Sequence, residues 1–150
     1  SDGIYFAPCN SSPATVVFRS NSERTNDPER LTLERRGLVC CPVLKLEDRV
    51  RLLNYQNNFI ERIDALRNLP NLIFLDLYNN CIEEMSDELS FVPTLRVLML
   101  GKNKIRMISN LDKLMKLDVL DLHSNRISKI QHLEELKDLR VLNLAGNEIS

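Results

Sequence analysis

The sequence predicts an α/β solenoid, with a curved parallel β-sheet on the concave side and 3₁₀ or short helical turns on the convex side. Three observations lead to this fold. The 150 residues contain 26 leucines, and none of them lies in residues 1–30. Asparagine recurs at intervals of 22 or 23 residues along the rest of the chain. Each of these asparagines stands in the same frame of apolar residues, which occurs five times: Asn58, Asn80, Asn103, Asn125 and Asn147.

The repeated frame reads L-x-x-L-x-L-x-x-N-x-I. Its copies span residues 50–60, 72–82, 95–105, 117–127 and 139–149. Each L-x-L unit predicts a short strand, because alternate side chains of a strand point to opposite faces and the leucines can then share one core. After the strand, apolar residues recur about every third position, which suits a 3₁₀ or short helical turn. In the second copy, one extra residue separates Met85 from Leu89.

The asparagine ladder has a structural explanation. A tight turn that is buried between coils leaves backbone N–H and C=O groups that need partners. An asparagine amide offers both a donor and an acceptor, so it can bridge two adjacent coils. We therefore interpret the five asparagines as scaffold and place function elsewhere on the molecule.

The two ends of the chain differ from the repeats. Residues 1–29 are polar and rich in turn-forming residues, which predicts an extended or disordered N-terminal arm with at most one strand around Thr15–Phe18. Residues 30–49 form a degenerate sixth copy, which we interpret as a capping repeat of a domain spanning residues 30–150. Residues 50–150 hold the five repeats, and the last is truncated. Because an uncapped end would expose an apolar face, we expect the native protein to continue.

The composition narrows the class of protein. Twenty Lys and Arg residues nearly cancel 21 Asp and Glu residues, which argues against a general nucleic-acid binder. No apolar run is long enough for a transmembrane helix, and no signal peptide is visible. No pair of the four cysteines has the C-x2-C spacing of a zinc site, which favours reduced thiols in a cytoplasmic protein.

Function is expected on the concave face, where the residues between the leucines form columns across the strands. Three columns are predicted: Leu52, Phe74, Val97, Val119 and Val141; Asn54, Asp76, Met99, Asp121 and Asn143; and Gln56, Tyr78, Gly101, His123 and Ala145. A concave, mixed surface with aromatic anchors is typical of a protein-binding face. The valines are expected to pack between strands. The candidate contact residues are Phe74, Asp76, Tyr78, Met99 and His123.

A basic edge accompanies the third and fourth copies, with Lys102, Lys104 and Arg106 as further candidate contacts and Arg126 and Lys129 beside them. Such an edge can meet an acidic partner. The alternative is a solvated face, since Glu83, Glu84 and Glu88 occur nearby in the sequence.

No enzymatic chemistry is indicated. The four glycines match no phosphate-binding motif, and the two histidines have no metal-ligand spacing. His123 follows Asp121 on the predicted concave face, yet neither a nucleophile nor a pocket accompanies this pair. We expect a non-catalytic protein without a cofactor or metal.

The 22-residue frame resembles the intracellular class of leucine-rich repeats. Particular strings go further: Leu31–Leu38, Arg51–Ile60, Leu72–Tyr78 and Leu117–His123 are similar to the leucine-rich-repeat subunits of tubulin polyglutamylase complexes. The resemblance spans residues 30–150. It implies a non-catalytic subunit that scaffolds or localises a tubulin-ligase-like enzyme at microtubules, centrosomes or cilia. The implied partners are that catalytic subunit, other subunits of the complex and tubulin, whose acidic tails suit the basic edge.

Two other roles are open for the same repeat class. A phosphatase-regulating adaptor would bind a phosphatase catalytic subunit through acidic and aromatic concave residues, although this face is less acidic than that role suggests. An axonemal component would dock on microtubules permanently. A spliceosomal, RNA-associated role is disfavoured by the neutral charge balance.

Overall fold

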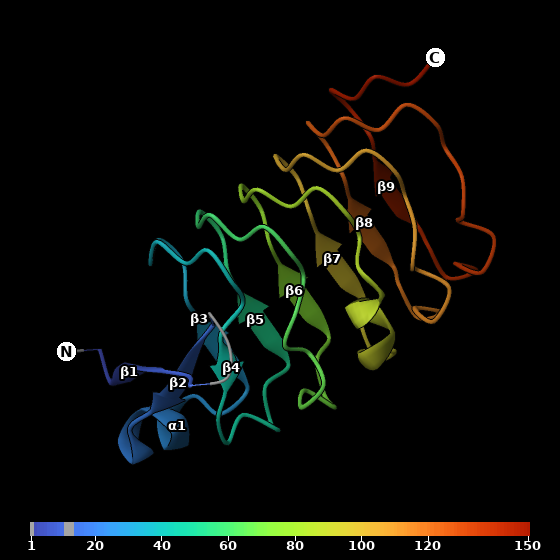
Figure 1. The fold of residues 1–150 in the computed structure, drawn as a ribbon. Coiled ribbons are helices and arrows are strands. Elements are labelled where there is room, and N and C mark those ends of the chain that lie inside the picture. The colour runs from blue at the N-terminus through green and yellow to red at the C-terminus, as the bar shows by residue number, and fades with distance from the viewer. Residues whose placement is uncertain (1, 11–13) are drawn as a thin grey trace.

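The computed structural model describes residues 2–10 and 14–150, and the chain forms the expected solenoid (Figure 1). Six short parallel strands make one sheet in the order β3-β5-β6-β7-β8-β9. Their bounds are β3 Arg30–Thr32, β5 Leu52–Asn54, β6 Phe74–Asp76, β7 Val97–Met99, β8 Val119–Asp121 and β9 Val141–Asn143. The predicted parallel-sheet leucine-rich-repeat fold is thereby confirmed.

The register of the sheet stacks equivalent leucines of successive coils. Leu53 pairs with Leu75, Leu75 with Leu98, and Leu98 with Leu120. These four side chains are 0% exposed. Burial of each contributes about 1.5–3 kcal/mol, and the central leucine column is therefore a main source of stability.

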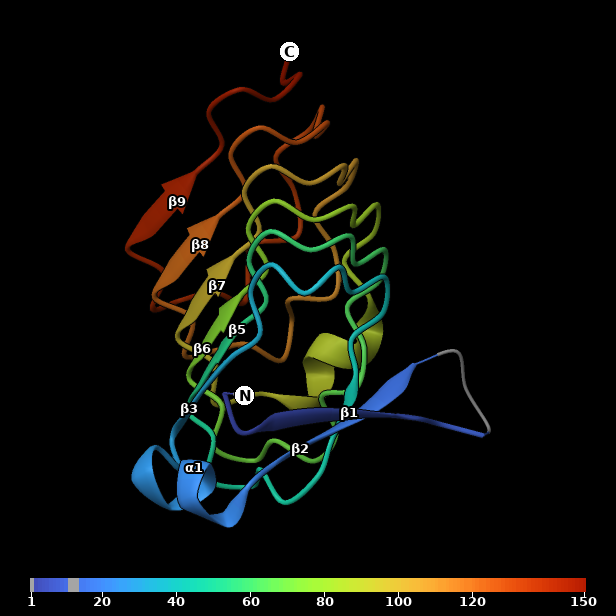
Figure 2. The same cartoon turned by 90° about the vertical axis from the view of Figure 1, so that its left-hand side faces the viewer.

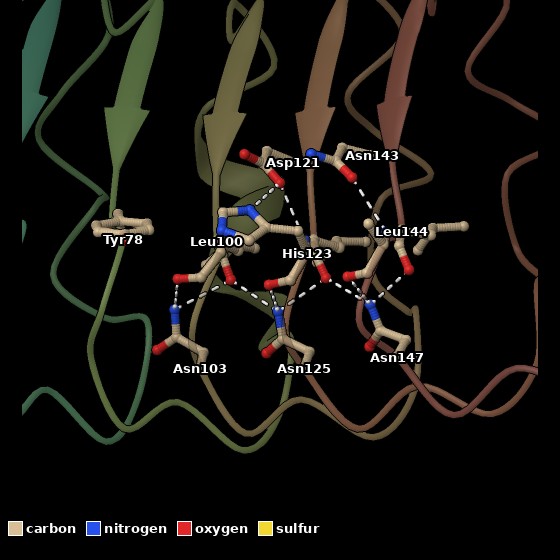
Figure 3. Close-up of polar contacts among 12 residues, drawn as sticks. Tyr78, Leu100, Asn103, Asp121, His123, Asn125, Asn143, Leu144 and Asn147 are labelled. Carbon is tan, nitrogen blue, oxygen red and sulfur yellow. Dashed lines mark hydrogen bonds and ion pairs between the residues drawn. The ribbon is translucent and has the colours of Figure 1, made fainter.

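The asparagine ladder is built as the sequence predicts (Figure 3). The amide nitrogen of Asn103 donates to the carbonyl oxygens of Leu77 in the preceding coil, at 2.9 Å, and of Leu100 in its own coil, at 3.1 Å. Its Oδ1 accepts the backbone N–H of Ile82 at 3.0 Å. The same pattern recurs at the other ladder positions: Asn58, Asn80, Asn125 and Asn147.

The N-terminal residues differ from the expected extended or disordered arm. Strands β1 (Ile4–Pro8) and β2 (Thr15–Arg19) form an antiparallel hairpin, and β2 also pairs in parallel with β4 (Val43–Leu44). Helix α1 (Asn21–Asn26) follows, capped by the Ser20 side chain. Figure 2 shows this hairpin and helix at the first coil of the solenoid. Val17 is 0% exposed, so the segment is a packed cap.

A buried ion pair fastens this cap. Arg19, at the end of β2, donates two hydrogen bonds to the Glu47 carboxylate, at 2.8 and 2.6 Å, and both side chains are 1% exposed. The third guanidinium nitrogen, Nη1, donates to the carbonyl oxygens of Asp27 and Arg30. Each nitrogen of the guanidinium and each oxygen of the carboxylate thus has a hydrogen-bond partner, as burial requires.

The convex side is made mostly of turns. Among the described residues, the one 3₁₀ helix is η1 (Asp87–Phe91), and it lies in the copy that carries the extra residue. Glu88 within it is 7% exposed and accepts the backbone N–H of Leu66 in the preceding coil at 3.1 Å. In the other coils the apolar residues at every third position are held without a helix.

The last coil is more open than the others. Leu142 of β9 is 37% exposed, whereas Leu120 in the equivalent position of β8 is 0% exposed. Val141 and Ile149 are also exposed. Within residues 2–10 and 14–150, no helix has the length and apolar character needed to cross a membrane.

Candidate functional site

The concave face presents the predicted columns. Residues on either side of each central leucine are half-buried on β5 and β7, while the leucine itself is buried. Phe74 at the start of β6 lies in register with Leu52 on one side and Val97 on the other. The side chains that this face presents therefore come from these columns and from the turn that follows each strand.

The middle column proves to have a structural role that sequence reasoning missed. In four coils an Asn or Asp side chain at the end of the strand accepts the backbone N–H of the residue two positions later. Asp76 accepts from Tyr78 at 3.0 Å, and Asp121 accepts from His123 at 2.9 Å. The other two are Asn54 and Asn143. The recurrence of Asn or Asp at one frame position was the available signal.

Asp76 is engaged further. Its second carboxylate oxygen accepts a hydrogen bond from the Gln56 amide, and the residue is only 7% exposed. Its oxygens therefore hold the turn and the neighbouring coil together. Asp76 remains a proposed contact residue, but its first role is to fix the position of Tyr78.

The coil of β7, which is the third repeat copy, breaks this pattern. The contact that results between neighbouring coils is the most distinctive feature of the concave face. Met99 stands where the other four repeat copies have Asn or Asp, and Gly101 stands where those copies have Gln, Tyr, His or Ala. The His123 ring fills the space above Gly101: a Cβ added to Gly101 would lie 2.2 Å from His123 Cε1. The absence of a side chain at Gly101 therefore lets His123 lie across the neighbouring coil.

His123 thereby meets Tyr78, two coils away. The two rings are stacked with centroids 5.8 Å apart and planes inclined by 30° (Figure 3). The Nζ atom of Lys102 lies 5.7 Å from the centroid of the Tyr78 ring. The opposite side of the histidine is fixed by Asp121, whose Oδ1 is 2.7 Å from Nδ1. We call these four residues the concave cluster: Tyr78, Lys102, Asp121 and His123.

The concave cluster combines two aromatic rings with an acidic and a basic side chain. A carboxylate only accepts hydrogen bonds, so Nδ1 of His123 carries the proton in this pair. Both rings are half-buried and offer apolar faces with polar edges. Among residues 2–10 and 14–150, no group of three or more His, Cys, Asp or Glu side chains is arranged to hold a metal ion.

The predicted basic edge is divided in the structure. Lys102 belongs to the concave cluster, and Lys104 is exposed in the turn after the ladder residue Asn103. Arg106 instead lines an open hollow of about 670 Å³ together with Glu83 and Glu84. These acidic neighbours reduce the local positive charge. This arrangement is the one expected if the edge is a solvated face, the alternative named in the sequence analysis.

Three solved structures share this architecture. An internalin of Listeria monocytogenes, inlF, superposes with a TM-score of 0.62 at 30% identity, covering 68% of this chain and 30% of that chain. Internalin C2 of the same organism superposes with a TM-score of 0.69 at 23% identity, covering 79% of this chain and 52% of that chain. The functional domain of its InlJ gives 0.67 at 20% identity, covering 79% and 25%. The last two show the fold alone.

Two curated relatives share more of the sequence. The chain is 51% identical over 85 residues to leucine-rich repeat-containing protein 49 of Homo sapiens, which covers 57% of this chain and 12% of that protein. It is 56% identical over 59 residues to the protein of the same name in Mus musculus, covering 39% and 9%. The chain therefore corresponds to a small part of these relatives.

The family comparison agrees with the geometry. The sequence pattern described as "Leucine Rich repeats (2 copies)" matches residues 48–90, 93–135 and 116–150. These matches cover more than half of the chain and coincide with the coils of the solenoid. The chain belongs to the leucine-rich-repeat family.

Proposed function

We propose that this chain is a non-catalytic protein-interaction scaffold of a tubulin polyglutamylase complex, in which it assembles or localises a tubulin-ligase-like enzyme on microtubules. The observation that carries the scaffold role is the concave cluster, in which Tyr78 and His123 stack across three coils beside Lys102. Leucine-rich-repeat proteins generally bind protein partners. The similarity of residues 30–150 to the subunits of such complexes supports the more specific assignment.

The concave cluster suits a protein partner for three reasons. Tyr78 and His123 have few rotatable bonds and are already held in place, so little conformational entropy is lost when they are covered. Their rings provide apolar area, and Lys102 supplies a cation at the rim. Phe74 and Met99 extend the apolar area along neighbouring strands, and Lys104 and Arg106 are proposed contacts outside the cluster, with Arg106 beside Glu83 and Glu84.

The proposed partners follow from the same assignment. They are the tubulin-ligase-like catalytic subunit, other subunits of the complex, and tubulin as a further contact. The proposed location is the cytoplasm, on the cytoskeleton at microtubules, centrosomes and cilia.

The test is affinity purification of the tagged full-length protein from ciliated or neuronal cells. The variant Tyr78→Ala/His123→Ala removes the stacked pair. The matched control is Phe91→Ala/His132→Ala, which removes one exposed aromatic ring and one exposed histidine outside the concave columns. We expect a ligase-like enzyme to copurify in stoichiometric amounts with the unsubstituted protein and the control, and to be lost with the concave variant.

Two outcomes would overturn the proposal. Recovery of a phosphatase catalytic subunit, or of axonemal proteins without a ligase, would replace the polyglutamylase assignment by one of the other adaptor roles. Equal recovery of the ligase by the concave variant and the control would show that the concave cluster does not bind it.

A further inference from the structure

A second basic surface lies along the side of the sheet that is formed by the N-terminal ends of the strands. In Figure 3 the strands run toward the asparagine ladder, so the N-terminal ends of the strands lie on the side of the sheet opposite to the ladder. Two open hollows of about 380 and 570 Å³ adjoin there and share Arg96 and Lys116. We call them together the strand-start groove. Its charged lining consists of six basic and three acidic residues: Arg49, Arg51, Arg96, Lys116, Lys137 and Arg140, with Glu29, Asp118 and Asp138.

Much of this positive charge is not neutralised within the chain. Asp118 and Arg140 satisfy each other through two hydrogen bonds of 2.5 and 2.7 Å. Among the described residues, Arg96 and Lys116, which line both hollows, have no acidic partner within 4.0 Å. The pKa of Asp118 is lowered mainly by the hydrogen bond from Arg140, and the more distant charge of Arg96 helps to lower it. The whole chain has a formal charge of −1, so the excess is local to this groove.

We infer that the strand-start groove binds a strongly acidic segment of a partner polypeptide in an extended conformation. Adjacent coils are about 4.8 Å apart, and an extended chain advances about 3.3 Å per residue, so roughly six residues span the distance from the β5 coil to the β9 coil. Acidic side chains at intervals along such a segment can approach successive basic residues of the groove.

The lining favours a polypeptide over a nucleic acid. Ile73 and Leu139 provide apolar contacts between the basic residues, and both belong to the turns that lead into strands. None of the described residues that line the two hollows is aromatic. Single-stranded nucleic acids are usually bound with their bases stacked on aromatic side chains, which this groove lacks.

The inference does not depend on which enzyme the concave cluster holds. The groove lies at the beginning of the strands, whereas Tyr78 and His123 lie beyond their ends. Binding of an acidic segment can therefore be measured without any other subunit of a complex. If the acidic segment did not bind, the scaffold proposal for the concave cluster would still stand. If the ligase did not bind, the inference about the strand-start groove would still stand.

The experiment titrates the 150-residue chain into a fluorescein-labelled peptide of about ten glutamates, a length that covers the span of the groove. Fluorescence anisotropy is followed at about 0.05 M salt, where exposed charges are only weakly screened. The test variant is Arg96→Glu/Lys116→Glu. The matched control is Arg62→Glu/Lys45→Glu, which reverses the same two residue types at exposed positions outside the groove. Circular dichroism and thermal unfolding check that both variants keep the fold.

We expect the test variant to weaken peptide binding by about tenfold or more, because two attractions become repulsions, and the control to change it much less. Equal weakening in both variants would reduce the effect to net charge and overturn the inference. So would the absence of binding by the unsubstituted chain. Tighter binding of an oligouridylate, or of vesicles containing phosphatidylserine, with the same dependence on Arg96 and Lys116, would assign the groove to another polyanion.

Discussion

At the scale of single residues, the side chains of the ladder asparagines hold adjacent coils together. Asn103 is 7% exposed and joins two coils through two hydrogen bonds to the preceding coil, of 2.9 and 3.0 Å, and one of 3.1 Å within its own coil. The Asn103→Ala variant leaves the carbonyl oxygen of Leu77 and the N–H of Ile82 without these side-chain partners. We expect unfolding to become easier by about 2–3 kcal/mol, measured by urea denaturation.

The control for this change is Asn68→Ala, at an exposed asparagine with no role in the ladder. It should alter the free energy of unfolding by less than about 0.5 kcal/mol. If both alanine variants lost the same stability, the ladder would not be the reason for the five recurring asparagines.

The buried thiol of Cys41 gives the protein a pH-dependent stability in the alkaline range. Burial raises the pKa of Cys41 from 9.0 to about 12. Well below pH 9 the thiol is neutral in both states, and its contribution to stability is complete. As the pH rises from 9 toward 12, the unfolded chain loses the proton first, so the free energy of unfolding falls by about 1.4 kcal/mol per pH unit.

Urea unfolding of the unsubstituted chain and of Cys41→Ala, under reducing conditions at several pH values above 8, measures this contribution. We expect the stability of Cys41→Ala to fall less steeply with pH. Burial also raises the pKa of Tyr55 well above 10.0, and this larger cause is common to both proteins; the smaller cause, the charge of Cys41, is lost in Cys41→Ala and adds to the expected difference. Parallel curves would show that Cys41 ionises equally in the folded and unfolded states.

The role of a residue could be predicted where the same residue type recurs in every coil and performs the same task there. The asparagine amide must satisfy a turn in every coil, so the period revealed it. The Asn or Asp column was visible as well, but its place on the concave face predicted a binding surface with Asp76 as a contact, and not a set of acceptors of local N–H groups. The place of His123 depends on the missing side chain of Gly101 in the preceding coil, and such a contact between coils is not encoded by either residue alone.

At the scale of elements, the five strands over residues 50–150 follow from the L-x-L units, whereas the N-terminal cap does not follow from any repeat. Strand β2 carries only Thr15–Arg19, and its buried residue Val17 pairs with Leu44 of β4, which comes 27 residues later. A short strand whose partner is distant in the sequence has no local periodic signal. The inward-facing Arg19 also concealed the burial, since arginine is seldom buried unless it is paired.

The ion pair between Arg19 and Glu47 gives this cap a specific test. Glu47→Leu leaves the Arg19 charge buried without its carboxylate and should cost about 3–5 kcal/mol in urea unfolding. Adding Arg19→Met removes the unpaired charge, so the double variant should be more stable than Glu47→Leu alone. The single variant Arg19→Met completes the cycle. Additive losses would show that the two side chains act independently despite their 2.6 and 2.8 Å contacts.

At the scale of the whole molecule, the solenoid has two unlike ends. Strands β3 and β9 are both at an edge of the sheet. The β3 end is covered by the cap: Leu31 is 1% exposed and Arg19 hydrogen bonds to the carbonyl oxygen of Arg30. All three residues of β9 are exposed. Because each coil is stabilised mainly by its neighbours, the β9 coil, which is the more exposed of the two in this 150-residue chain, should open most easily when that chain is studied by itself.

Amide hydrogen exchange of the 150-residue chain tests this asymmetry. The amides of β7 and β8 should exchange slowest, through opening of most of the array, and those of β9 should exchange much faster, through local opening of the last coil. The decisive comparison is between the two edge strands. We expect β3 to be protected nearly as well as the central strands, because the cap must open before it does. Equally rapid exchange of β3 and β9 would mean that the hairpin and α1 do not stabilise the first coil, despite the buried Val17 and the Arg19–Glu47 pair.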